Sequence, residues 1–137
     1  MANVLPSDSE VGFFVADDVR QELNNKITLV GFYPGSIINV KDIGPGVFVP
    51  LAFLIIVTGG EGQFKFKIDL FAPSNQLLFE GPVADLTKSP NLTSLTVTKL
   101  TGFPFASVGK YRISIALDGK RYDRFLNVGR DPNLVLA

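Results

Sequence analysis

The chain of 137 residues contains no cysteine and no histidine. Without cysteine it forms no disulfide and holds no metal through a thiolate, and without histidine it lacks the commonest general base and transition-metal ligand. An enzyme built on this chain would depend on Asp, Glu, Lys, Tyr or Ser, and no pair of these residues has a recognisable catalytic spacing. We therefore expect no catalytic residue, no cofactor and no metal ion.

An excess of charge of one sign is also absent, because 13 Lys and Arg balance 13 Asp and Glu. A chain without net charge has no long-range field that attracts nucleic acid or an anionic membrane. The one membrane-like run, residues 47–57, has eleven residues with Pro50 inside, whereas a helical span needs about 20 apolar residues. We expect no nucleic-acid partner and no membrane partner, and interpret this run as a buried strand.

Basic residues do gather near the C-terminus, and aromatic residues lie among them. Such a mixture can bind single-stranded nucleic acid through stacking and backbone contacts. Acidic residues alternate with the basic ones, however, and neutralise much of the patch. The basic residues are Lys110, Arg112, Lys120, Arg121, Arg124 and Arg130, and the acidic ones are Asp118, Asp123 and Asp131.

The length suits one domain, and the 46% of hydrophobic residues suit a globular core. Residues 1–10 are polar, contain Pro6 and predict an irregular lead-in, so the β-sandwich domain is expected over residues 11–137. No basic residue precedes Arg20, which argues against a secretory signal peptide and makes the cytoplasm the expected compartment.

Short apolar runs with a period of two recur along the chain and predict strands. The clearest is 63–70, where Phe64, Phe66, Ile68 and Leu70 alternate with mostly charged residues. No stretch of ten or more residues has a period of 3.6. The fold class is therefore all-β: a two-sheet antiparallel sandwich, immunoglobulin-like, with seven to nine strands and little helix, the alternative being a closed β-barrel. The other expected strands are 11–16, 26–33, 36–40, 47–57, 76–80, 92–100, 109–117 and 120–128.

The turns between these strands are marked by dipeptides that favour positive φ. Asp118-Gly119 predicts a two-residue type I′ hairpin, Asn24-Asn25 a turn before the strand 26–33, and Pro34-Gly35 a type II turn after that strand. This part of the chain is expected to form a second hairpin. Gly44-Pro45-Gly46 is interpreted as a loop within the domain.

The Asp118-Gly119 hairpin carries a specific test of register. A two-residue loop pairs Leu117 with Lys120 and Ile113 with Arg124. Both cations then lie on the core face. They must extend past that face to reach solvent or a partner, or the loop is longer and the register different.

The densest polar cluster on the chain consists of Asp17, Asp18, Arg20 and Glu22. In strand geometry Asp18, Arg20 and Glu22 share one face and Asp17 lies on the other. Carboxylates in this arrangement suit a hard cation such as Ca²⁺ or an acid/base pair of the glycosidase type. The interpretation that we favour is an ion-paired strand end that protects a sheet edge.

A distinctive N-terminal motif consists of Phe14, of the run 16–22 (Ala-Asp-Asp-Val-Arg-Gln-Glu), and of Lys26 through Gly31-Phe32-Tyr33. Through this motif the chain resembles an uncharacterised bacterial family of small β-sandwich proteins. The resemblance extends in outline to Gly109-Lys110-Tyr111 and the strand that returns from it. The resemblance implies a β-sandwich fold and a bacterial, cytoplasmic protein, and it implies no activity.

Three functions are compatible with these features. The first is a non-catalytic protein-interaction or structural module, self-associating or with another protein partner, because the strand 11–16 is apolar on both faces and the tail 134–136 is apolar. The second is a small-ligand or carbohydrate-binding module. The absence of Trp and the inward alternation of Phe64 and Phe66 favour core packing over a sugar-binding face. A carboxylate-dependent enzyme is the third.

Overall fold

The computed structural model describes residues 3–44 and 48–134. In these residues the chain forms ten strands and three short 3-10 helices, Asp8–Glu10, Leu23–Asn25 and Pro34–Ser36. The strands are β1 (Val11–Gln21), β2 (Ile27–Phe32), β3 (Ile37–Val40), β4 (Phe48–Val57), β5 (Gly62–Phe71), β6 (Leu77–Glu80), β7 (Ala84–Lys88), β8 (Ser94–Pro104), β9 (Gly109–Leu117) and β10 (Lys120–Arg130).

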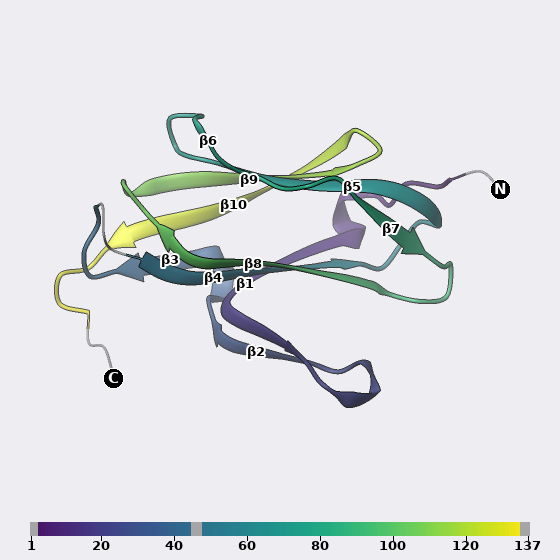
Figure 1. The fold of residues 1–137 in the computed structure, drawn as a ribbon, viewed down its shortest axis with the longest axis horizontal. Helices are drawn as coiled ribbons and strands as arrows, with labels where there is room; N and C mark the ends of the chain where they lie inside the picture. Colours follow the sequence, from purple (N-terminus) through teal and green to yellow (C-terminus); the bar gives the residue numbers. More distant parts are fainter. Residues whose placement is uncertain (1–2, 45–47, 135–137) are drawn as a thin grey trace.

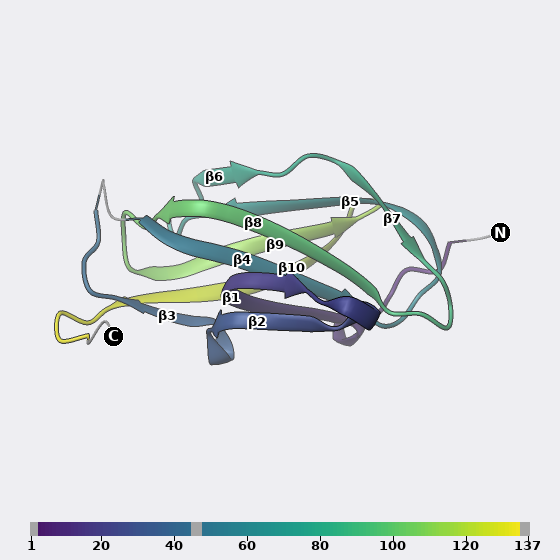
Figure 2. The ribbon, with the colours of Figure 1, turned by 60° about the horizontal axis from the view of Figure 1, so that its bottom comes forward.

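The strands form two sheets packed face to face, which confirms the predicted all-β sandwich (Figure 1). One sheet has four strands in the order β2-β1-β4-β8, and the other has six, in the order β3-β10-β9-β5-β6 with β7 also paired to β5. Figure 2 shows β1 and β2 as neighbours in the smaller sheet. The pairs are antiparallel except for β3 and β10, which run parallel.

Strand β7 is the one that alternation did not predict. Its inward positions are Leu86 and Lys88, and both side chains are buried. The Lys88 ammonium donates to the carbonyl oxygen of Ser89. A lysine at an inward position breaks the apolar pattern by which a half-buried strand is recognised.

The hairpin of β9 and β10 has the predicted register. Leu117 pairs with Lys120 and Ile113 with Arg124, and both turn residues have positive φ, 49° at Asp118 and 83° at Gly119. A type I′ turn requires this conformation. The prediction of a two-residue loop is therefore confirmed.

Lys120 and Arg124 extend from the core face to the lead-in that precedes β1. The Lys120 ammonium lies 3.2 Å from the carbonyl oxygen of Pro6. The Arg124 guanidinium donates to the carbonyl oxygens of Asp8 and Val11, each at 2.8 Å. The cations thus end on backbone acceptors of the lead-in and of the first residue of β1.

The two turns around β2 have different roles. The turn at Asn24, where φ is 63°, joins β1 to β2 in an antiparallel hairpin. The turn at Pro34 and Gly35 sends the chain to the other sheet, where β3 pairs with β10. A hairpin is thus formed at Asn24, by β1 and β2, and the hairpin predicted at Pro34-Gly35 is wrong because β3 pairs with β10 instead of β2.

Strand β1 changes partner at Ala16. Residues 11–16 pair with β4, whereas residues 16–21 pair with β2. The first part contributes Val11 and Val15 to the main core between the sheets. Val19 instead packs with Ala52 and Leu54, which face away from that core because their neighbours on β4 face into it. The β1–β2 hairpin therefore covers part of the outer face of the smaller sheet.

Two predicted features lie partly outside the described residues. These are the loop at Gly44-Pro45-Gly46 and the apolar tail after Leu134.

Candidate functional site

The predicted polar cluster divides between two faces of the smaller sheet. Asp18 and Arg20 lie together, with 3.7 Å between the Arg20 Nε and a carboxylate oxygen of Asp18. Asp17 instead accepts a hydrogen bond from the Tyr33 hydroxyl at 2.5 Å. Glu22 is exposed and lies in the turn after β1. The division follows from strand geometry, because successive side chains point to opposite faces.

Asp18 is held by a cation that sequence reasoning did not connect with it. The Lys99 ammonium on β8 lies 2.9 Å from a carboxylate oxygen of Asp18. This hydrogen bond is the main reason that the pKa of Asp18 is lowered from its ordinary value, and the Val19 amide and Arg20 lower it further. Asp18 is thus held in its ionised form, which suits an ion pair and does not suit a general acid.

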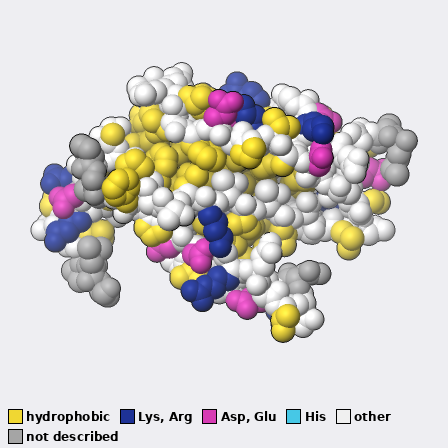
Figure 3. Space-filling model, in the orientation of Figure 1, with side chains coloured by type: hydrophobic (Ala, Val, Ile, Leu, Met, Phe, Trp, Pro, Cys, Tyr) yellow, Lys and Arg dark blue, Asp and Glu magenta, His cyan; other side chains and the backbone are white. Residues whose placement is uncertain are grey.

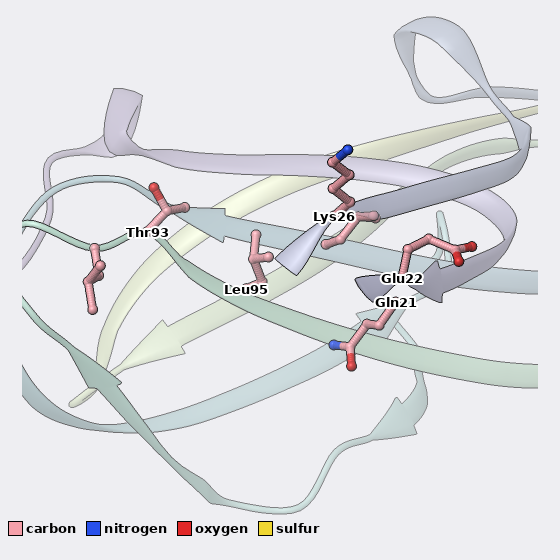
Figure 4. Close-up of a pocket in the computed structure, with 7 residues that line it drawn as sticks. Gln21, Glu22, Lys26, Thr93 and Leu95 are labelled. Carbon is pink, nitrogen blue, oxygen red and sulfur yellow. The ribbon is translucent and has the colours of Figure 1, made fainter. Parts of the chain in front are cut away.

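Two hollows flank the end of the β1–β2 hairpin where it meets β8. One has a volume of about 510 Å³ and is lined by Gln21, Glu22 and Lys26 from the hairpin side and by Thr93 and Leu95 from the other (Figure 4). In Figure 4 the charged ends of Glu22 and Lys26 point away from Leu95.

The second hollow, of about 790 Å³, extends from Gln21 and Glu22 of the hairpin to Val97 and Lys99 of β8. Both hollows therefore follow the outer side of β8.

Asp17 and Tyr33 lie at a third hollow, at the opposite end of the smaller sheet. Burial and the hydrogen bond to Asp17 raise the pKa of Tyr33. The Asp17 carboxylate lies against Gly31, whose φ is 63°, and a side chain at Gly31 would overlap it. The hollow has a volume of about 530 Å³, and Phe48 and Leu134 are among the residues that line it.

Strand β8 forms one edge of the smaller sheet. In the part of the chain that the structure describes, it pairs with β4 and with no other strand. It has eleven residues, and Lys99 is the only charged one. The sequence signal was the run of Thr, Leu and Val over 92–100, which predicts a strand but not which of its edges is free.

An apolar band lies beside this edge. Figure 3 shows hydrophobic side chains gathered across the middle of the molecule, over the region between β5 and β8. Leu100 of β8 and Phe79 of β6 are only partly buried where they pack against the main core. The sandwich is therefore open on this side, and its opening is apolar.

The basic residues near the C-terminus are dispersed and paired. Arg121 lies 3.1 Å from Asp123, and Lys110 lies over the ring of Phe125. Arg124 and Lys120 contact the lead-in. Their charges therefore do not form one continuous basic surface.

The described residues contain no group of three or more acidic, histidine or cysteine side chains placed to hold a metal ion. Among the same residues, none of the helices has the length and apolar composition needed to cross a membrane.

The fold and this surface define an all-β sandwich with one open side. A family model for a family of unknown function, DUF6941, matches residues 11–126, and the chain belongs to this family. The match covers Phe14 to Tyr33 and the Gly109 strand, so the resemblance to an uncharacterised family is confirmed at that level. No curated protein matches the chain.

Proposed function

We propose that this protein is a non-catalytic interaction module that binds a protein partner along the open side of the sandwich. An extended segment of the partner pairs with strand β8 and covers the apolar band beside it. The observation that carries the proposal is the edge of β8 that pairs with no strand of the described residues, because such an edge offers a row of backbone donors and acceptors to another chain.

The position of Lys99 supports this function. Lysine commonly protects an edge strand by making its pairing with another chain unfavourable. Here the Lys99 ammonium is bound to Asp18 on the β1–β2 hairpin, which draws the charge away from the edge. The rest of β8 is uncharged, so a partner strand meets little electrostatic resistance.

The carboxylates support a module without catalysis. A general acid needs a raised pKa near neutral pH, whereas the pKa of Asp18 is lowered. Asp17 is occupied by the Tyr33 hydroxyl. We also propose that the protein acts in the bacterial cytoplasm with an immunoglobulin-like sandwich. This proposal is supported by the family resemblance and by a chain without the disulfides on which small secreted domains commonly rely.

A second candidate function is small-ligand binding at the hollow of Asp17 and Tyr33. The observation in its favour is a carboxylate that lies at the wall of a partly apolar hollow of about 530 Å³, a size found among ligand sites. Panels of small amines added to the protein, followed by thermal unfolding, would identify such a ligand.

The main proposal is tested with a phage-displayed library of random peptides selected on the full chain. Enriched peptides are expected to shift the backbone amide NMR signals of β8. Thr98→Lys adds a charge at this edge and should weaken peptide binding by about tenfold or more. Thr28→Lys, on the opposite edge strand β2, is the matched control and should leave binding unchanged.

Circular dichroism of both variants confirms that they are folded. Failure to enrich any binding peptide on protein whose β8 is not already paired with another chain would overturn the proposal. So would peptides that shift amides elsewhere, or equal binding by folded Thr98→Lys protein and wild type.

A further inference from the structure

We infer that the partner that fits strand β8 is a second copy of this chain, joined by antiparallel pairing of the two β8 strands about a two-fold axis. The inference rests on the proposed function, because both use the same edge. The second copy is then the one occupant of this edge, and the smaller sheets of the two copies form one continuous sheet.

The residues of β8 are compatible with pairing to themselves. With the axis at Thr98, each Thr98 faces its copy, Thr96 faces Leu100, and Val97 faces Lys99. Directly opposed residues on antiparallel strands interact most strongly, and Thr–Thr pairs are favourable there. The pairing thus places a small hydroxyl residue at the axis and apolar atoms on both sides of it.

The charges allow two copies to meet. The chain has no net charge, and proteins without net charge associate more readily because they do not repel one another. Each Lys99 stays bound to Asp18 of its own copy at 2.9 Å. Bound in this way, the Lys99 side chain is directed away from the other copy and leaves no unpaired lysine charge beside the axis.

The apolar band gives the interface its hydrophobic contribution. A two-fold axis brings the same surface of each copy to the contact, so the band beside one β8 approaches the band beside the other (Figure 3). Apolar surfaces need no charge matching, and burying them away from water favours association. Leu100 and Phe79, partly exposed in one copy, lose further contact with water.

Other surfaces of the chain suit this contact less well. The outer face of the larger sheet carries ion pairs, such as Lys67–Glu80 at 3.1 Å, and is suited to solvent. Strand β2, the other edge of the smaller sheet, has six residues and contains Gly31 at a φ of 63°, whereas Gly102 of β8, at 67°, lies near the end of that strand and away from Thr98. Strand β8 is longer and nearly free of charge.

Sedimentation velocity of the full chain over a range of concentrations tests the inference. Wild type and Thr28→Lys should sediment as dimers, and Thr98→Lys as a monomer. Because the chain has no cysteine, Thr98→Cys introduces a single thiol at the axis, and opposed Cα atoms lie within disulfide reach. Under mild oxidation Thr98→Cys should form a covalent dimer at least about tenfold faster than Thr28→Cys.

A wild-type monomer at the highest concentration would overturn the inference, as would a dimer that Thr98→Lys leaves intact or equal cross-linking of the two cysteine variants. The proposed function is judged separately. If the protein is a monomer and selected peptides still shift its β8 amide signals, the dimer is overturned and the proposed interaction module stands. A monomer whose selected peptides bind elsewhere overturns both.

Discussion

Gly31 is the residue that allows Asp17 and Tyr33 to meet. Its φ of 63° is a conformation that residues with a Cβ rarely adopt, and the Asp17 carboxylate fills the space where a side chain would lie. Gly35 has a similar φ of 69°, but the nearest atom to a Cβ there is 3.8 Å away. A substitution at Gly35 therefore carries only the cost of a positive φ, whereas one at Gly31 carries that cost and a steric overlap as well.

Gly31→Ala should lower the free energy of unfolding more than Gly35→Ala does. The difference should be about 1–3 kcal/mol, because at Gly31 the overlap with Asp17 adds to the cost of a positive φ. Urea unfolding of both variants measures the difference. In an Asp17→Ala background the two substitutions should cost about the same. Equal losses in the wild-type background would contradict the steric role of Gly31.

Tyr33 predicts a difference between wild type and Tyr33→Phe that depends on pH. Its pKa is raised in the folded protein, so its stabilising contribution is fully present below the ordinary tyrosine pKa of about 10. The contribution is lost as the pH rises from there through the raised pKa. At pH 8 the Tyr33→Phe variant should be less stable by about 1 kcal/mol, through loss of the hydrogen bond.

The measurement is urea unfolding of both proteins at pH 8 and pH 11. The difference in free energy of unfolding should shrink at pH 11, since only wild type carries this phenol. A difference that stays constant or grows would contradict a raised pKa of Tyr33 in the folded protein.

At the scale of elements, the lead-in is attached to β10 by three side chains that alternate along the core face of that strand, Lys120, Tyr122 and Arg124. The Tyr122 hydroxyl donates to the carbonyl oxygen of Pro6 at 2.6 Å, where Lys120 also donates. Arg124 contacts Asp8 and Val11. Residues that alternate along one strand thus hold a segment more than a hundred positions away.

Arg124→Met should lower the free energy of unfolding by about 1.5–3 kcal/mol, because hydrogen bonds to a charged group are lost while the aliphatic stem is kept. It should also speed proteolytic cleavage within the lead-in. Arg121→Met is the control. Its side chain is 56% exposed and pairs with Asp123 at the surface, so its effect should stay within about 0.5 kcal/mol. Equal effects of the two substitutions would contradict the role of Arg124.

At the scale of the whole molecule, one core connects the two sheets. Buried residues from both sheets belong to the same cluster, among them Phe53 of β4, Leu70 of β5 and Ile115 of β9. The small cluster of Val19, Ala52 and Leu54 lies on the other side of β4 and shares that strand with the main core. The two clusters are therefore expected to unfold together.

We predict a single cooperative unfolding transition in urea. Far-UV circular dichroism, which follows the strands, and near-UV circular dichroism, which follows packed Tyr and Phe, should give the same midpoint. Val19→Ala should move both midpoints equally. A transition in which the β1–β2 hairpin separates first would appear as midpoints that differ between the two signals.

Much of the fold was predictable because the signals are local. Alternation, continuous apolar runs and β-favouring composition together predicted nine of the ten strands, and Asp118-Gly119 defined the register of its hairpin through the positive φ of a two-residue turn. Strand β7 was missed because Lys88 occupies an inward position. The split of the acidic cluster also followed from alternation, but its partners Tyr33 and Lys99 did not.

The sequence by itself determined where the strands lie, how the β9–β10 hairpin pairs, and that the chain has neither thiol nor imidazole chemistry, since each of these depends on neighbouring residues or on composition. Tertiary structure alone decided that Lys99 reaches Asp18 and that β8 is left with one partner in the described residues. These outcomes depend on the order of strands in a sheet. That order is set by packing between segments far apart in the chain, which local patterns do not encode.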